Sequence, residues 1–310
     1  MKIFITGSSD GIGREAVRQL AHRGDTVWGI ARRLEPLLEL QEELGKDKFY
    51  FSVVAVHENS IYLSSEGATP TGYRPFLKKF NLNIKQVSEI FRSSENSLES
   101  FLGFLDETNF TIYLTSFETS TVSPQKRIRK VSETDLNKFE LLYADSNPFE
   151  ILSKLKKEVL KYKRKDGVEL SATFYYPINY DSSKKYPLVI DAYPLEYTDA
   201  KTASQVRNSA HNFVAPFRAS SIYLALRGYA VMEEAQMPIV GHPETKNDTF
   251  LSQLVMDAEA AIAAAEKTKI VDTKRVGVIG HSYGAFMVAN LLSHTKLFSA
   301  GVARSVSYNR

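Results

Sequence analysis

The chain has 310 residues, of which 43% are hydrophobic and 24% are charged, so its composition is that of a folded globular protein and not of a disordered chain. Its 39 basic and 36 acidic residues nearly balance, and no run of like charge favours binding to nucleic acid. The absence of cysteine excludes disulfides, thiolate metal sites and a cysteine nucleophile. With no bilayer-length apolar stretch and no secretory signal pattern, we expect a cytoplasmic protein that binds neither membranes nor nucleic acid.

Three stretches differ in pattern and predict three parts. Residues 1–48 predict strand, glycine turn, helix, strand and helix, which is a Rossmann-like βαβ start with parallel strands. Residues 49–157 hold short alternating runs between turn-rich pieces, and these predict an antiparallel assembly long enough for about two propeller blades. Residues 158–310 alternate buried strands with helices, including an alanine-rich helix over 252–267. The predicted fold class is therefore α/β, with partial β-propeller blades in the middle.

A glycine-rich segment, TGSSDGIG at residues 6–13, follows the first predicted strand and opens a helix. In such a turn Gly7 permits a sharp exit from the strand, Gly11 lets the backbone approach a pyrophosphate, and Gly13 lets helix pack on strand. The helix N-terminus would direct its N–H groups at the phosphates. Two arginines after the second strand would pair with a 2′-phosphate, so NADP is preferred over NAD. The candidate cofactor-binding residues are Gly7, Gly11, Ile12, Gly13, Arg32 and Arg33.

This segment, the helix GREAVRQLAHRG and the strand end GIARR resemble the N-terminus of a short-chain dehydrogenase/reductase. The resemblance covers about the first 48 residues and implies an NADP-dependent reductase as an alternative function. The catalytic signature of that family is missing in context, because Tyr180 and Lys184 match Tyr-x-x-x-Lys only in a polar turn. Hydride transfer is not expected, and a non-catalytic chimeric fragment is a further alternative.

A second motif, GHSYG at residues 280–284, lies between a predicted buried strand over 275–279 and an apolar helix over 285–294. This is the context of a nucleophile elbow, which lifts a serine hydroxyl above the sheet edge. Ser282 is the candidate nucleophile, and the Tyr283 N–H is one candidate oxyanion donor. Tyr193, at the end of the predicted strand over 186–192, is the candidate second donor.

The elbow and its flanks resemble the prolyl oligopeptidase (S9) family of serine peptidases, and its glutamyl-endopeptidase-like branch in particular. The segments that carry the resemblance run from about residue 50 to residue 310 and include KYKRKDGVELSATFYYP, PLVIDAYPLEY and RVGVIGHSYGAFMVANLLSH. The resemblance implies an α/β-hydrolase domain preceded by propeller blades, a peptide substrate and no cofactor. It implies an acyl-enzyme on Ser282, and only faintly a cleavage after acidic residues.

The chain departs from that family after the elbow. Only 28 residues follow Ser282, and they hold no Asp or Glu and a single histidine, His294. Twelve residues of helix would place His294 roughly 18 Å from Ser282. Because acyl transfer needs a histidine base and an acid that orients it, we expect a truncated hydrolase domain with weak or no turnover. The sequence indicates no metal site and no oligomeric state.

Overall fold

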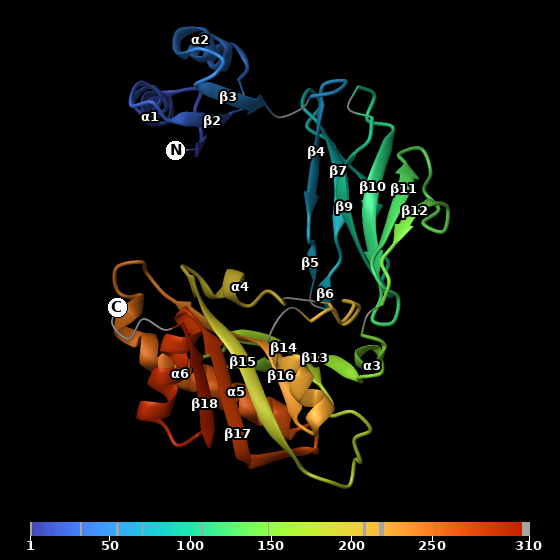
Figure 1. The fold of residues 1–310 in the computed structure, drawn as a ribbon, viewed down its shortest axis with the longest axis vertical. Helices are drawn as coiled ribbons and strands as arrows, with labels where there is room; N and C mark the ends of the chain where they lie inside the picture. The colour runs from blue at the N-terminus through green and yellow to red at the C-terminus, as the bar shows by residue number, and fades with distance from the viewer. Residues whose placement is uncertain are drawn as a thin grey trace. The chain divides into compact units, whose positions relative to one another are not determined.

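The computed structural model describes residues 2–31, 33–53, 56–69, 71–106, 108–147, 149–206, 209–216 and 220–305. The chain divides into two compact units, which are described separately below. Unit 1 comprises Met1–Leu63 and Lys78–Ser88, and unit 2 comprises Ser64–Leu77 and Glu89–Arg310 (Figure 1).

Unit 1 begins with a parallel three-stranded sheet and two helices. The elements are β1 (Lys2–Thr6), α1 (Gly11–His22), β2 (Thr26–Ala31), α2 (Glu35–Leu44) and β3 (Phe49–Val53), and the strand order is β1-β2-β3. The predicted strand–turn–helix–strand–helix order is therefore present. β3 follows directly and pairs in parallel with β2, with Tyr50 opposite Trp28. The apolar stripes of the two helices close the core around fully buried residues: Val17, Val27, Leu37, Leu40 and Phe49.

The middle of the chain forms antiparallel and short strands. A three-stranded sheet in the order β4-β7-β8 comprises Ser60–Ser65, Phe76–Asn81 and Val87–Arg92, and β5 (Ala68–Thr69) pairs with β6 (Gly72–Tyr73). A four-stranded antiparallel sheet in the order β12-β11-β10-β9 comprises Glu140–Ala144, Gln125–Lys130, Ile112–Glu118 and Leu98–Phe104. The expected antiparallel strands are thus present after residue 60.

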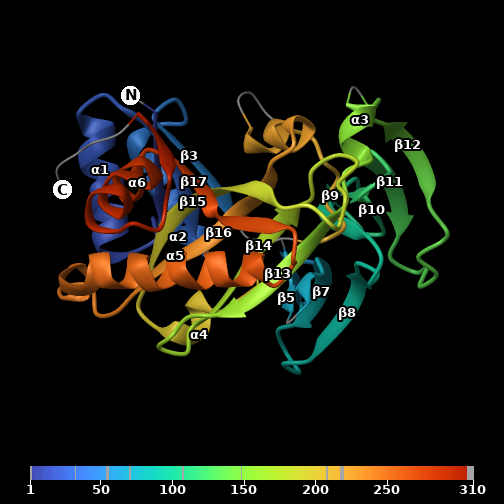
Figure 2. The ribbon, with the colours of Figure 1, turned by 90° about the horizontal axis from the view of Figure 1, so that it is seen from below.

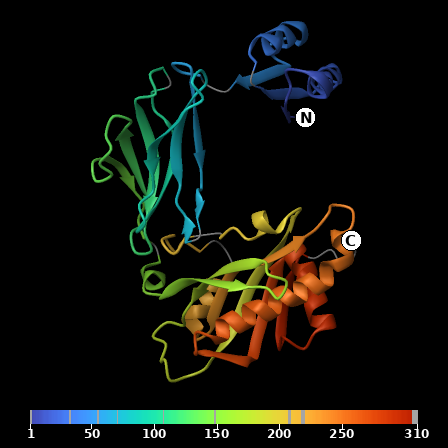
Figure 3. The ribbon, with the colours of Figure 1, turned by 180° about the vertical axis from the view of Figure 1, so that it is seen from behind.

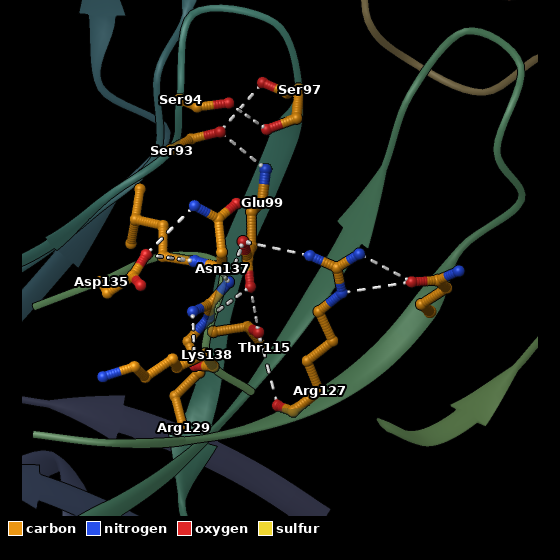
Figure 4. A network of polar contacts seen from close by, with 12 residues as sticks. Ser93, Ser94, Ser97, Glu99, Thr115, Arg127, Arg129, Asp135, Asn137 and Lys138 are labelled. Carbon is orange, nitrogen blue, oxygen red and sulfur yellow. Dashed lines mark hydrogen bonds and ion pairs between the residues drawn. The ribbon is translucent and has the colours of Figure 1, made fainter. Parts of the chain in front are cut away.

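A buried polar network cross-links the four-stranded sheet (Figure 4). Glu99 of β9 accepts two hydrogen bonds from the Arg129 guanidinium of β11, at 2.7 and 2.8 Å, and one from Thr115 Oγ1 of β10 at 2.5 Å. Arg129 also donates to the backbone oxygens of Leu136 and Lys138. Because the buried carboxylate and guanidinium satisfy each other, the network ties three strands and the loop before β12 together.

The C-terminal part of unit 2 is built on a six-stranded sheet in the order β13-β14-β16-β15-β17-β18. β13 and β14 form an antiparallel hairpin, β14 pairs antiparallel with β16, and β16, β15, β17 and β18 run parallel. The strands are β13 (Lys157–Lys163), β14 (Glu169–Tyr175), β15 (Tyr186–Tyr197), β16 (Ala230–Val240), β17 (Val271–His281) and β18 (Ala300–Arg304).

Two long helices, α5 (Phe250–Glu266) and α6 (Tyr283–His294), pack on one face of this sheet (Figures 2 and 3). Buried alanines of α5, such as Ala258, Ala261 and Ala265, let the helix approach the strands closely. Shorter helices, α3 (Glu150–Ser153), α4 (Ala200–Ala203), η1 (Ser221–Arg227) and η2 (Lys246–Thr249), connect the elements. Among the described residues no helix is long and apolar enough to cross a membrane.

Candidate active site

Ser282 is the single residue between β17 and α6, and its backbone is strained. Its φ of 53° and ψ of −114° lie in a region that costs a non-glycine residue about 1–3 kcal/mol. The turn is held from both sides: Ser282 N donates to Arg304 O of β18 at 2.9 Å, and Ser282 O accepts from Ala285 N and Phe286 N. The side chain is exposed. The strand–turn–helix order predicted around GHSYG is therefore present, with the serine at its apex.

Both glycines of the motif are required by close backbone contact. A Cβ on Gly280 would lie 2.1 Å from Gly284 O, and a Cβ on Gly284 would lie 2.7 Å from Ala192 O of β15. Backbone atoms cannot retreat from such contacts without moving the strand or the helix. The first turn of α6 is thereby seated directly against β15.

Tyr193 and Tyr283 lie beside each other at this turn. A Cβ on Gly284 would be 3.5 Å from Tyr193 Cδ2, and the two tyrosine rings meet edge to face with centroids 6.1 Å apart. Tyr193 is 46% exposed. The strand that carries it is longer than the range predicted from sequence, 186–192: β15 continues to Tyr197 because its pairing with β16 continues to Val240. Tyr193 thus lies inside β15 and not after its end.

None of the described residues hydrogen bonds to the Ser282 hydroxyl. His294 lies at the end of α6, where its Nδ1 is 2.9 Å from Asn290 O. Burial lowers the pKa of His211, and His242 Nδ1 accepts from Glu244 N at 3.4 Å. No histidine in the described part of the chain hydrogen bonds to the Ser282 hydroxyl, so none is in place there as its base.

A polar cavity of about 550 Å³ adjoins the elbow, since His281 and Arg304 contribute to its wall. It opens at the carboxyl ends of the parallel strands, where α/β sheets commonly bind ligands. Asp191, Glu233 and Glu234 line it together because of a bulge: Ile190 pairs with Met232 and Ala192 with Ala235, so two residues of β16 stand opposite Asp191.

Burial shifts the ionisation of several groups in this cavity. The pKa of Glu233 is raised to about 7, first by burial and then by the charges of Glu234 and Asp191. Burial likewise raises the pKa of Asp191. The pKa of Lys157, which also lines the cavity, is lowered to about 8, because burial outweighs the attraction of Glu118 and Glu233. Sequence patterns did not indicate Lys157 and Glu233, because each lies among other charged residues of its own strand and the two meet only when the sheet assembles.

The glycine turn of unit 1 has a different character. Gly7 and Gly11 have φ of 71° and 50°, with open space where a Cβ would be, while a Cβ on Gly13 would lie 2.4 Å from Gly7 O. Ile12 is 91% exposed. This backbone fits the close approach of phosphates. The other candidate cofactor residue of this turn region, Arg32, lies outside the described residues.

Asp10 and Arg33 are paired at the same helix terminus. Arg33 Nη2 lies 2.7 Å from Asp10 Oδ2, and Asp10 Oδ1 accepts from Gly11 N at 2.8 Å. The Arg33 guanidinium holds the pKa of the exposed Asp10 carboxyl below its usual value. A phosphate at this site would have to compete with Asp10 for both donors. Among the described residues no group of three or more His, Asp or Glu could hold a metal ion.

The mixed sheet with a strained serine between an inner strand and a helix is the architecture of an α/β-hydrolase. Residues 251–309 match the model of the prolyl oligopeptidase family, and residues 1–61 match that of short chain dehydrogenases. Both predicted resemblances are confirmed by these matches, and similarity to curated peptidases extends the first of them across 81% of the chain.

A probable chloroplastic glutamyl endopeptidase of Arabidopsis thaliana is 36% identical over 262 residues, which cover 81% of this chain and 27% of the relative. An NADPH-dependent 1-acyldihydroxyacetone phosphate reductase of Saccharomyces cerevisiae is 46% identical over 43 residues, which are 14% of each chain. The crystal structure of Porphyromonas gingivalis dipeptidyl peptidase 4 aligns with a TM-score of 0.58 at 19% identity, covering 82% of this chain and 35% of that one. The chain spans about a quarter of the length of the glutamyl endopeptidase relatives it matches: 27% of the protein from Arabidopsis thaliana and 28% of the protein from Oryza sativa subsp. japonica.

Proposed function

We propose that unit 2 carries the catalytic serine of a peptidase of the prolyl oligopeptidase type, with Ser282 as nucleophile and a peptide as substrate. The observation that carries this proposal is the strain at Ser282, held in place by two glycines that backbone contact requires. Strain of this kind persists only where the surrounding structure enforces it, and it is concentrated at functional sites. The glutamyl endopeptidase relatives support the same assignment. In this proposal the sheets β4-β7-β8 and β9–β12 are partial propeller blades.

The chemistry follows from the positions of three groups. Ser282 Oγ attacks the carbonyl carbon of the peptide and forms a tetrahedral adduct, whose oxyanion is stabilised by the Tyr283 N–H and by Tyr193. Collapse of the adduct expels the amine and leaves an acyl-enzyme on Ser282, which water then hydrolyses. Oxyanion donors that are fixed before the reaction contribute most where water is excluded. This reaction requires no cofactor.

Proton transfer limits this reaction in the 310-residue chain. Removing the Ser282 proton and protonating the amine requires a base at Oγ, and none of the described residues is placed there. We therefore expect turnover of peptides to be very weak. An oxyanion site without its base retains a small rate advantage over water.

Labelling with a fluorophosphonate tests the assignment of the nucleophile. The parent chain is compared with Ser282→Ala and with the control Ser293→Ala, which removes the hydroxyl of an exposed serine near the end of α6. We expect slow covalent labelling of the parent and of Ser293→Ala, because the oxyanion donors favour phosphonylation while no base activates Oγ, and none of Ser282→Ala. Labelling that persists in Ser282→Ala, or a parent that melts cooperatively and stays unlabelled even after long exposure to the probe, would contradict Ser282 as the nucleophile.

A second proposal concerns unit 1, which would bind NADP through its glycine turn. The positive φ values at Gly7 and Gly11 and the tight approach of Gly13 to Gly7 favour it. Backbone N–H groups of the turn would hold the phosphates, and Arg33 would pair with the 2′-phosphate. When bound, NADP would supply a hydride, but we propose binding alone. Thermal melts with NADP and with NAD test it, and the absence of any shift would contradict binding.

A further inference from the structure

The end of β15 reaches past the nucleophile strand and lies against the start of α6. The pairing of β15 with β17 ends at Asp191 opposite Ile279, whereas its pairing with β16 continues to Tyr197 opposite Val240. This extension carries Tyr193 and, three residues later, Glu196. One strand segment therefore contributes both a proposed oxyanion residue and a nearby carboxylate.

Glu196 joins the residue after the nucleophile to a lysine of η2. Tyr283 Oη donates to Glu196 Oε1 at 3.1 Å, and Lys246 Nζ lies 2.6 Å from Glu196 Oε2. The side chains of Glu196 and Lys246 are only 24% and 14% exposed. A half-buried carboxylate is costly unless it is paired, and Lys246 offsets that cost while leaving the other oxygen for Tyr283.

Aromatic packing fixes the same ring on its other sides. The Tyr283 ring stacks on Phe250 with centroids 5.7 Å apart, and on Phe286 at 6.2 Å, while Tyr193 meets it edge to face. Stacking resists tilting of a ring but allows it to slide in its plane. The directional bond from the phenol to Glu196 sets the position within that plane.

The strand behind Glu196 is itself braced against α5. Gln253 accepts a hydrogen bond from Val240 N at 2.9 Å and donates to Val240 O at 3.0 Å. Arg164 donates to Pro238 O at 2.8 Å and to Asp257 Oδ1 at 3.0 Å, and it is 2% exposed. The end of β16 therefore gives β15 a rigid support beside the elbow.

We propose that Glu196 and Lys246 are positioning residues for the acyl-transfer reaction. By fixing the Tyr283 side chain on β15, they fix the Tyr283 N–H relative to Tyr193, so that both oxyanion donors face one point. We call the hydrogen bond from Tyr283 Oη to Glu196 Oε1 the lock. The positioning role rests on the proposed function, because the lock can assist acyl transfer only if Ser282 forms a tetrahedral adduct. The energetic coupling of Glu196 to Tyr283 through the lock is a separate physical claim.

The positioning role is tested by the kinetics of fluorophosphonate labelling. Glu196→Ala should lower the first-order rate of phosphonylation by about tenfold or more while leaving the half-saturating probe concentration unchanged. Glu196→Gln should recover most of that rate, because its amide oxygen still accepts from Tyr283 Oη. Glu259→Gln, at an exposed site on α5, is the control and should label like the parent. Parent-like labelling of Glu196→Ala, or no recovery with Gln, would overturn the positioning role.

The lock is tested without any labelling, by thermal melts of Glu196→Ala, Tyr283→Phe and the double variant. We expect the two losses to be non-additive by about 2 °C or more, because both substitutions remove the same hydrogen bond. Additive losses would overturn the lock. A parent that binds no label while its melts are non-additive would instead contradict the proposed function and leave the lock standing.

Discussion

The chain contains two turns that lead from a strand through glycines into a helix, and they differ in which residue bears the strain. At residues 6–13 the positive φ values fall on Gly7 and Gly11, for which they cost little. At residues 280–284 the positive φ falls on Ser282. Each turn also has a glycine that backbone contact requires, Gly13 in the first and Gly284 in the second.

The surroundings explain how the second turn keeps its strain. β17 lies between β15 and β18: Ser282 N is bonded to Arg304 O of β18, and Gly284, two residues later, is in close contact with β15. The first turn has similar support, since Gly7 N donates to Ile30 O of β2 at 2.9 Å, but there glycine adopts the positive φ at little cost. Conformational strain on a non-glycine residue such as Ser282 indicates that the surrounding fold fixes its position, whereas a positive φ on glycine is unstrained and indicates only a sharp turn or a close approach of the backbone.

The two turns also differ in their carboxylates. Asp10 is exposed, and Arg33 lowers its pKa, so the first turn presents an ionised side chain to solvent. Glu233 and Asp191 near the second turn have raised pKa values because burial disfavours their charged forms. At the first turn an anionic ligand would compete with the exposed Asp10 carboxylate for its hydrogen-bond donors, whereas the second turn borders a cavity with buried carboxyl groups.

The largest effect is expected from adding a methyl group where backbones touch. Gly284→Ala places a Cβ 2.7 Å from Ala192 O, and overpacking against backbone should destabilise unit 2 by about 3 kcal/mol or more. Gly103→Ala, a strand glycine with open space around its missing Cβ, is the control and should be nearly neutral. Chemical denaturation measures both. A tolerated Gly284→Ala would show that α6 does not seat directly on β15.

How far the sequence predicts these turns depends on the range of the contacts involved. Glycine spacing and apolar periodicity are local, so both turns and their flanking elements could be predicted, with α6 beginning two residues earlier than expected. The extension of β15 could not be predicted, because it depends on pairing with β16, some forty residues further along the chain. The same holds for Glu233 beside Lys157 and for Glu196 beside Lys246, which meet only when separate elements assemble.

The next largest effect is a pH-dependent gain from Glu233→Gln. The folded-state pKa of about 7 exceeds the ordinary value of 4.5, so between these values the folded chain binds a proton that the unfolded chain has lost. Stability supplied by that proton is complete below about pH 4.5 and is lost as pH rises through 7. Glu233→Gln should thus stabilise the chain by on the order of 2–3 kcal/mol at pH 8 and have little effect at pH 4.5. Denaturation at both pH values, with Glu259→Gln as control, measures this. Equal effects at both pH values would refute the desolvated cavity.

A smaller effect separates two ways of removing the Ser282 hydroxyl. Ser282→Ala keeps the strained φ, whereas Ser282→Gly relieves it at the cost of a more flexible unfolded chain. We expect Ser282→Gly to be the more stable variant by about 1 kcal/mol, and neither variant to be labelled by a fluorophosphonate. Ser9→Gly, in the first turn, relieves no positive φ and should bring no such gain. If Ser282→Ala is as stable as Ser282→Gly, the elbow stores no strain.

The smallest effect on stability belongs to the Asp10–Arg33 pair, although it decides the proposal for the first turn. Both side chains are exposed, so Arg33→Ala should leave the melting temperature unchanged. It should, however, reduce the upward shift caused by NADP to that caused by NAD, because the 2′-phosphate loses its guanidinium. Asp10→Asn still caps Gly11 but releases Arg33 and removes a negative charge beside the phosphates, so it should enlarge the NADP shift. An NADP shift that neither substitution alters would place the dinucleotide away from this turn, and the positive φ values of Gly7 and Gly11 would then serve the fold alone.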